Sequence, residues 1–405
     1  MLTGSARTLY IIFMFSVIRS IPWAAEGFAV GAARRRQWMP RTVLQLSRGL
    51  PTTSIPIPEL VTEVFESMKN ASEIIDVRSP VEFAEDHIPG AVNLPVLTNE
   101  ERHEIGIAYK GSPFEAKKAG ASLVAANIAT HVQKHFADLP GGYHPLVYCW
   151  RGGSRSSSMA LVLAQIGWRV KLVDGGYKRY RSEVRSYLAS APATFQFRLL
   201  AGLTGVGKTE LLHILRGRGH QVLDLEGMAN HRGSLLGAAD QPPQPTQKYY
   251  ESLIADCLRG FDTDKVVYVE AESSRVGEVQ LPPMLWKSMN EAPRVEVRLP
   301  MSVRVGRILK DYDYWIKNPE ELKHMLLKLK SRHGGATLEA WFGLIDEGQW
   351  PAFVERLLLE HYDSSYEQQA SRFDHPGHVI QLDDFSPSEV DRFVDAIVAS
   401  SSSCH

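Results

Sequence analysis

The sequence predicts an α/β chain of two units, each built on a parallel sheet, followed by a helical C-terminal region. Two observations predict this class. Short apolar runs of strand length alternate with helical patterns from about residue 55, and the alternation restarts near residue 195. A chain of 405 residues also exceeds one ordinary hydrophobic core, so two or three domains are expected. We divide it into an extension over 1–54, a domain over 55–190 and a domain over 191–400.

In the first domain, apolar periodicity and turn residues predict the following order. The segment 57–60 leads into a helix that runs through Ser67, and Pro80 starts a second helix behind a serine. Strands are expected at 73–77, within 88–95, at 146–148 and at 169–173. Longer helices are expected at 115–136 and, behind the Cys149 loop, up to residue 167.

The same reasoning predicts the second domain, with a boundary near residues 189–192. Strands are expected at 195–201, 221–225, 265–270, 294–299 and 379–382, and helices at 208–216, 247–258 and 386–399. Between the last two strands lies a helical insertion of about 303–370, read as helices at 303–317, 319–332, 337–347 and 350–369.

Composition narrows the class of protein. The chain is 44% hydrophobic and 22% charged, as soluble globular proteins are, and its net charge of −1 provides no global basic field for nucleic acid. Three cysteines, Cys149, Cys257 and Cys404, make no disulfide or zinc framework, so we expect a reducing compartment.

The N-terminal extension differs from the rest of the chain. Residues 1–38 hold five arginines and one acid, Glu26, and the ten-residue apolar run from Leu9 to Ile18 is too short to span a bilayer. Three interpretations stay open: a transit peptide, a signal-type apolar segment, or an upstream leader before a true start at Met39. We favour Met39, which places the protein in the cytoplasm without a membrane anchor; a transit peptide would place it in an organelle.

The first candidate site surrounds Cys149, at the end of a predicted strand. The loop that follows it is Trp150, Arg151, Gly152, Gly153, Ser154 and Arg155. Two adjacent glycines permit a tight turn whose N–H groups converge, and a helix begins directly behind it. Such surroundings favour a thiolate and hold an anion beside it, so we expect Cys149 to be a nucleophile that carries a group on its sulfur. Arg151 and Arg155 either acidify the thiol or hold a phosphate.

The second candidate site is a P-loop between a predicted strand and helix. Its residues, from Gly202 through Thr204, Gly205 and Gly207 to Lys208 and Thr209, fit the phosphate-binding pattern. Backbone N–H groups are expected to cradle a diphosphate, Lys208 to neutralise it, and Thr209 to ligate Mg²⁺ if the site uses a metal, which the sequence leaves unknown.

Polar loops after the next two strands of the second domain are candidates for substrate contacts, because such loops line the ligand crevice of an open α/β sheet. Glu270 and Asp224 are the alternative acidic partners of the P-loop, although either can equally cap a helix. The candidate substrate residues are Asp224, Glu226, Asn230, His231, Arg232, Glu270 and Arg275.

These motifs carry a family resemblance. The segments 76–83 and 86–95, the Cys149 loop and Gly175-Gly176-Tyr177 resemble a rhodanese domain, in which Asp76, Arg78, Asp86 and His87 are expected to be structural. A rhodanese domain followed by a P-loop domain with Asp-Leu-Glu-Gly-Met-Ala-Asn-His-Arg-Gly-Ser at 224–234 resembles the bacterial tRNA 2-selenouridine synthases over about 55–390.

The resemblance implies conversion of 2-thiouridine to 2-selenouridine at the wobble position of tRNAs for Lys, Glu and Gln. Geranyl diphosphate would alkylate the base sulfur at the P-loop domain, giving S-geranyl-2-thiouridine. Selenophosphate would then supply selenium, with Cys149 as the chalcogen carrier. The implied partners are the tRNA anticodon stem-loop and an enzyme that supplies selenophosphate.

Finer assignments follow from that activity. A geranyl chain needs an apolar pocket, and the aromatic candidates for its wall are Trp286, Tyr312, Tyr314, Trp315, Trp341 and Phe342. Trp150 is the candidate for stacking an extruded wobble base, and the basic helical segment 303–332 is the candidate anticodon-stem binder. Two other functions stay open: a rhodanese fused to an ATP- or GTP-hydrolysing P-loop module, and a sulfur carrier without enzymatic activity.

Overall fold

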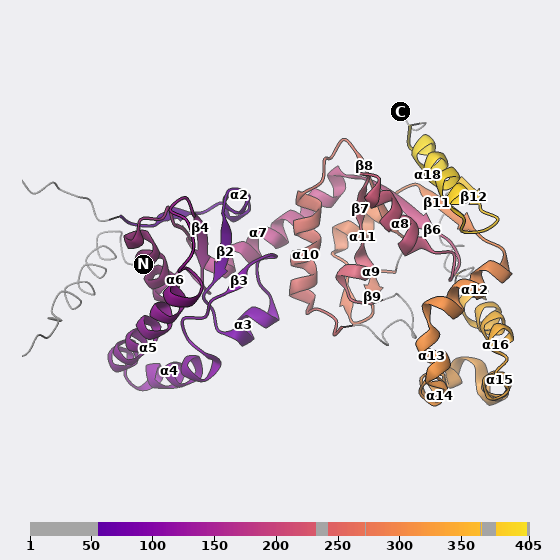
Figure 1. The fold of residues 1–405 in the computed structure, drawn as a ribbon, viewed down its shortest axis with the longest axis horizontal. Coiled ribbons are helices and arrows are strands. Elements are labelled where there is room, and N and C mark those ends of the chain that lie inside the picture. Colours follow the sequence, from indigo (N-terminus) through magenta and orange to yellow (C-terminus); the bar gives the residue numbers. More distant parts are fainter. Residues whose placement is uncertain (1–55, 232–241, 272, 365, 367–377, 403–405) are drawn as a thin grey trace, which may run out of the picture. The chain divides into compact units, whose positions relative to one another are not determined.

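The computed structural model describes residues 56–231, 242–271, 273–364, 366 and 378–402 (Figure 1). The interpretations of the N-terminal extension, including a start at Met39, lie outside these residues. Within the described part, no helix is both long and apolar enough to cross a membrane.

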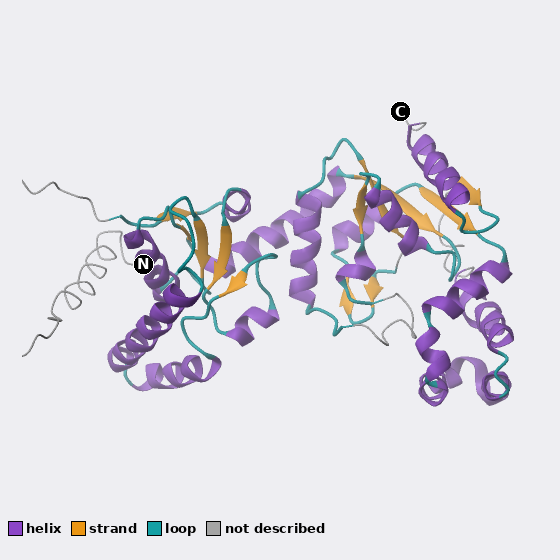
Figure 2. Cartoon of the chain, in the orientation of Figure 1, coloured by secondary structure: helices purple, strands orange, loops and turns teal. Residues whose placement is uncertain are grey.

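The first sheet is parallel throughout, as predicted, with the strand order β1-β5-β4-β2-β3. Its strands are β1 (Glu59–Val61), β2 (Glu73–Asp76), β3 (Val92–Asn93), β4 (Pro145–Tyr148) and β5 (Lys171–Val173). The helices around it are α2 (Val64–Lys69), α3 (Pro80–Glu85), α4 (Asn99–Gly111), α5 (Pro113–Lys134), α6 (Ser154–Ile166) and α7 (Gly176–Ser190). Helices flank the sheet (Figure 2), and every residue of β4 is buried, because apolar side chains pack on both faces.

Three local predictions in this domain differ from the structure. Residues Glu59–Val61, expected only to lead into a helix through Ser67, pair with β5 as an edge strand, and the helix follows at Val64–Lys69. Helix α4 was not predicted: it has no buried residue and hence no apolar periodicity, although Thr98 and Glu101 form a capping box at its start. Helix α7 was not predicted either, because the two glycines at its start, Gly175 and Gly176, indicate a turn.

The second sheet is also parallel, with the order β12-β11-β6-β8-β7. Its strands are β6 (Gln196–Ala201), β7 (Gln221–Leu223), β8 (Val266–Glu270), β11 (Arg294–Arg298) and β12 (His378–Gln381). A short 3₁₀ turn, η1 (Ala191–Thr194), leads into it, and β9 (Arg275–Val276) pairs with β10 (Val279–Gln280) in a separate hairpin. Its helices are α8 (Lys208–Gly217), α9 (Leu225–Met228), α10 (Gln247–Arg259), α11 (Pro283–Asn290) and α18 (Pro387–Ser402). Helix α11 was not predicted.

A helical region between β11 and β12 confirms the predicted insertion and has its own apolar core. It comprises α12 (Met301–Asp311), α13 (Asp313–Lys317), α14 (Pro319–Leu326), η2 (Leu327–Leu329), α15 (Lys330–Asp346), α16 (Trp350–Leu357) and the π-helical η3 (Leu358–Asp363). Gly334, at φ 78°, breaks the helical path inside α15, at the gap expected between the helices 319–332 and 337–347.

The two sheets are joined through α7 and α10, whose apolar faces belong to one continuous buried cluster. At its edge lies Asp86, which is 1% exposed. Its carboxylate accepts hydrogen bonds from Tyr177 (2.6 Å) and from Ser252 of α10 (2.9 Å), and Arg181 lies 4.0 Å away. Burial raises the pKa of Asp86, and these partners offset part of that rise. Asp86 therefore links the two domains, which specifies the structural role expected of it.

We expect Asp86→Ala to lower the free energy of unfolding by about 2–4 kcal/mol, because two buried hydroxyl groups lose their acceptor. Glu85→Ala is the matched control. That neighbouring side chain is half exposed and pairs with the half-exposed Lys248, so its loss should cost less than about 1 kcal/mol. Denaturant unfolding of the full chain measures both values, and equal losses would contradict the role of Asp86.

Candidate functional site

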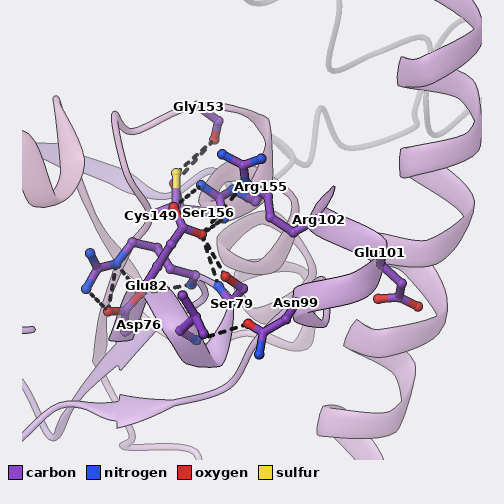
Figure 3. A network of polar contacts seen from close by, with 12 residues as sticks. Asp76, Ser79, Glu82, Asn99, Glu101, Arg102, Cys149, Gly153, Arg155 and Ser156 are labelled. Atoms are coloured by element: carbon purple, nitrogen blue, oxygen red, sulfur yellow. Dashed lines mark hydrogen bonds and ion pairs between the residues drawn. The ribbon is translucent and has the colours of Figure 1, made fainter. Parts of the chain in front are cut away.

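Cys149 lies directly after β4 and is 3% exposed. Figure 3 shows its sulfur beside Ser156 and Gly153 at the start of α6. The Ser156 hydroxyl donates to the sulfur at 3.0 Å, and the thiol lies 4.0 Å from the Gly153 carbonyl oxygen. The sulfur is thus enclosed between a strand end and the N-terminus of a helix, an arrangement suited to holding an anion.

Two glycines allow the Cys149 loop to pack backbone against backbone on the turn after β5. Gly152 has φ +65°, and a Cβ there would lie 2.8 Å from the Val173 carbonyl oxygen. Gly176 has φ +56°, and its Cβ would lie 2.2 Å from the Cys149 carbonyl oxygen. That oxygen instead accepts the N–H of Tyr177 at 2.8 Å. Side chains at these two positions are excluded by both conformation and space.

Arg155 pairs with Glu82 at 2.7 Å (Figure 3). Burial disfavours the charged form of Glu82, but the hydrogen bond from Arg155 lowers its pKa below the usual value. Glu82 also closes the capping box of α3 with Ser79. Arg155 therefore braces the loop against α3, whereas Arg151 is exposed.

Trp150 is half buried and stacks on Tyr177, with 5.2 Å between ring centroids. One face of the indole is therefore covered by protein, which restricts the base stacking proposed for it. Behind Tyr177 the guanidinium of Arg78 lies 4.2 Å from the ring centroid and pairs with buried Asp76 at 2.6 Å. Asp76 and Arg78 are structural, as expected.

The P-loop connects β6 to α8. Gly202, Gly205 and Gly207 all take positive φ, and a Cβ at Gly202 would lie 2.6 Å from the Val297 carbonyl oxygen of β11. The ammonium group of Lys208 folds back to the Gly202 carbonyl oxygen at 3.1 Å. The ammonium group of Lys208 therefore lies over the loop. A diphosphate bound to the N–H groups of the loop would occupy the same position.

The candidate acids divide into different roles. Asp224 caps α9 by accepting the Gly227 N–H at 2.8 Å, and it contacts His213 of α8 at 2.8 Å. Glu226 is the acid that reaches the P-loop, since the Thr209 hydroxyl donates to it at 3.5 Å. Glu270 ends β8, beside Leu200 of the P-loop strand, and is 1% exposed.

The remaining candidate substrate residues lie around α9 and the β9–β10 hairpin. Asn230 is left-handed at φ +49°, and its amide donates to the Pro243 carbonyl at 3.0 Å. His231 is half buried, and its N–H donates to the Glu226 carbonyl. Arg275 donates to the Gly277 carbonyl of its own turn, and Arg232 lies outside the described residues.

Helix α12 supports the P-loop from outside. Arg304, 3% exposed, donates to the Thr204 carbonyl at 2.9 Å and forms a two-pronged pair with Asp363 at 2.6 and 3.0 Å. Arg307 lies over the ring of Phe385 and pairs with Glu210 of α8. Arg304 therefore stabilises the P-loop and is too buried to contact a tRNA. The exposed basic residues of the proposed tRNA-binding segment include Lys310, Lys328, Lys330 and Arg332.

An apolar pocket opens beside the P-loop, with Thr204 in its wall. It has about 560 Å³ of empty space, its open mouth included. Aliphatic and aromatic side chains of the helical region complete it, among them Ile308, Leu309, Tyr312, Trp315, Leu357 and Tyr362. Of the six predicted aromatic candidates, Tyr312 and Trp315 lie in this wall. Trp341 is a fully buried core residue that donates to Glu360, and Trp286 packs in the core between the sheets.

Sequence reasoning missed Ser156, Arg304 and Asp363. Ser156 belongs to a run of three serines at a helix start, which looks like a solvated first turn. Arg304 and Asp363 are far apart in the chain, and only tertiary packing brings them together. Among the described residues, no group of three or more His, Cys, Asp and Glu side chains is arranged to hold a metal ion by itself.

Comparison with known proteins matches two segments of the chain. Residues 61–183 match the rhodanese-like domain, and residues 195–333 match the tRNA 2-selenouridine synthase AAA domain. The protein is thus a rhodanese-like domain joined to a P-loop-type domain of a tRNA-modifying class.

Individual relatives extend the match. The tRNA 2-selenouridine synthase of Sulfurovum sp. is 33% identical, over 75% of this chain and 90% of its own length. Those of Chromohalobacter salexigens (34% identical, 73% of this chain and 87% of the relative) and Nitrosomonas europaea (36%, 59% and 63%) are similar. The chain belongs to the tRNA 2-selenouridine synthase family.

Gly176→Ala should destabilise the protein by about 3 kcal/mol or more, because the added Cβ meets backbone atoms at a left-handed position. Gly142→Ala is the control. Gly142 is exposed, and a Cβ there would have no atom within 4 Å, so its variant should unfold at the same temperature as the natural chain. Thermal unfolding followed by circular dichroism compares them; an unchanged Gly176→Ala variant would contradict the described backbone packing.

Proposed function

We propose that this protein converts 2-thiouridine to 2-selenouridine at the wobble position of tRNAs for Lys, Glu and Gln. The observation that supports the chemistry best is the pairing of two anion cradles within one compact unit: the enclosed thiol of Cys149 and the P-loop with an apolar pocket at Thr204. Membership of the tRNA 2-selenouridine synthase family supports the substrate.

The first step is alkylation of the base sulfur by geranyl diphosphate. The P-loop N–H groups and Lys208 hold the diphosphate, and the pocket takes the apolar chain. The base sulfur attacks the first carbon of the geranyl group, the carbon–oxygen bond breaks, and diphosphate leaves, stabilised by the same donors. Thr209 and Glu226, whose side-chain oxygens lie 3.5 Å apart, would hold a Mg²⁺ ion if one accompanies that diphosphate.

The second step exchanges the alkylated sulfur for selenium. Alkylation turns the sulfur into a better leaving group. The selenium of selenophosphate then attacks the base carbon and the geranyl thiolate leaves. Water cleaves the remaining selenium–phosphorus bond, which releases phosphate. Cys149 is the residue we assign to chalcogen handling, because its sulfur faces a helix N-terminus that favours anions. A cytoplasmic enzyme that makes selenophosphate is the partner this step requires.

A nucleotide hydrolase is the alternative function for the P-loop. The wall of the adjoining pocket favours an apolar chain over a ribose, because it is formed by the aliphatic and aromatic side chains of the helical region. Tight ATP or GTP binding with turnover, and no response to geranyl diphosphate, would favour the hydrolase. Unchanged tRNA selenation in cells carrying Cys149→Ala would instead indicate a protein without this enzymatic role.

Two variants should stop the reaction at different steps. In assays with thiolated tRNA, geranyl diphosphate and selenophosphate, Lys208→Ala should abolish both products, because diphosphate departure loses its cation. Cys149→Ser should abolish selenation and leave geranylated nucleoside in the digest. Nucleoside mass spectrometry reads both; loss of geranylation in Cys149→Ser would mean that the domains do not divide the two steps.

The pocket assignment predicts a selective binding defect. Leu309→Trp fills the pocket and should weaken binding of geranyl diphosphate about tenfold or more, since a few methylene groups lose their burial. Inhibition by inorganic diphosphate should stay unchanged, because the P-loop is intact. Leu327→Trp, at an exposed position of the same region that does not line the pocket, is the control. Equal weakening of both ligands would contradict a chain-binding pocket.

A further inference from the structure

The sulfur of Cys149 needs a stabilising partner that the charged side chains of the loop do not provide. Arg155 is paired with Glu82, which Arg102 also approaches at 3.9 Å, so its charge is directed toward α3. Arg78 is likewise committed to Asp76. Arg151 is exposed to solvent, where its field is screened.

The group in contact with the sulfur is a hydroxyl. Ser156 is fully buried in the first turn of α6, and its Oγ lies 3.0 Å from Cys149 Sγ and 3.3 Å from the Gly153 carbonyl oxygen. A serine hydroxyl has one proton, so it donates to one of these acceptors at a time. Hydrogen bonds to charged acceptors are the stronger ones, so an ionised sulfur takes the proton in preference to the carbonyl.

We propose that Ser156 is a catalytic residue of the Cys149 site: its hydroxyl donates to the thiolate and holds it ready for the chalcogen, an inference that rests on the proposed role of Cys149. When Cys149 is protonated, its S–H faces the Gly153 carbonyl oxygen at 4.0 Å. The Gly153 oxygen therefore accepts from the protonated thiol, and the Ser156 hydroxyl donates to the thiolate.

Ser157 provides a matched control. It stands next to Ser156 in the same helical turn, but its hydroxyl donates to the Gly153 carbonyl at 3.1 Å. Ser156→Ala and Ser157→Ala each remove one oxygen from the same turn and leave Arg151, Arg155, Glu82, Arg102 and the Asp76–Arg78 pair in place. A difference between the two variants therefore reports the contact with sulfur.

The test measures the rate at which iodoacetamide alkylates Cys149 in the full chain, from about pH 5 to about pH 10. The sulfur–carbon bond forms as iodide leaves, so the rate follows the thiolate. Peptide mass spectrometry separates Cys149 from the other cysteines; burial raises the pKa of Cys257 to about 11, so it reacts little near neutral pH.

Ser156→Ala should react about tenfold more slowly at neutral pH, with its rate profile displaced upward by about one pH unit, because the thiolate loses a hydrogen bond. Ser157→Ala should match the natural chain. A Ser156→Ala profile that coincides with the natural one would overturn the proposal, as would an equal displacement in both variants. Thiolate absorbance in the ultraviolet, with Cys149→Ser as baseline, gives a second reading of the same displacement.

This experiment uses neither tRNA nor selenium, so its outcome is separable from that of the proposed function. A displaced profile together with intact selenation in Cys149→Ser would retain the role of Ser156 in ionising the sulfur and remove Cys149 from the reaction. An unchanged profile together with lost selenation in Cys149→Ser would retain Cys149 in the reaction and remove the role of Ser156 in ionising its sulfur.

Discussion

The contact between the Cys149 loop and the Gly175–Gly176 turn is the constraint on which the rest of the structure depends. The Tyr177 N–H holds the Cys149 carbonyl, and the absence of side chains at Gly152 and Gly176 lets the two backbones meet. Helix α7 starts at this contact, and its buried face continues into the cluster shared with α10. The loop that shapes the thiol is therefore also the point from which the connection to the second domain begins.

Asp86 extends this constraint into a polar connection. Tyr177 stacks on Trp150 of the loop and donates to Asp86, which also accepts from Ser252 in the second domain. Burial raises the pKa of Tyr177, and its hydrogen bond to Asp86 adds to that rise, so the phenol remains a donor. The Cys149 loop and the P-loop domain thus share one buried set of hydrogen bonds.

Most of the fold class follows from local pattern. The strands ending at Tyr148 and Ala201 are mainly apolar runs of strand length, and each is followed by a glycine-containing loop. As the pattern predicts, each loop begins at a strand end and leads into a helix. Helix α4 was missed because it has no fully buried residue, and α7 because it starts at Gly176, directly behind Gly175. Motif residues such as Lys208 are recognisable by spacing. Ser156, Arg304 and Asp363 are not, because their roles depend on which side chain meets which atom after packing.

The near-complete burial of Cys149 has a consequence for oxidative chemistry. Thiol–disulfide exchange requires the attacking sulfur to approach along the axis of the disulfide, and a bulky disulfide such as oxidised glutathione needs open space on that axis. A sulfur that is 3% exposed between β4 and α6 does not offer it. The walls around the sulfur therefore protect Cys149 from mixed disulfides with bulky partners, and they do so by shape.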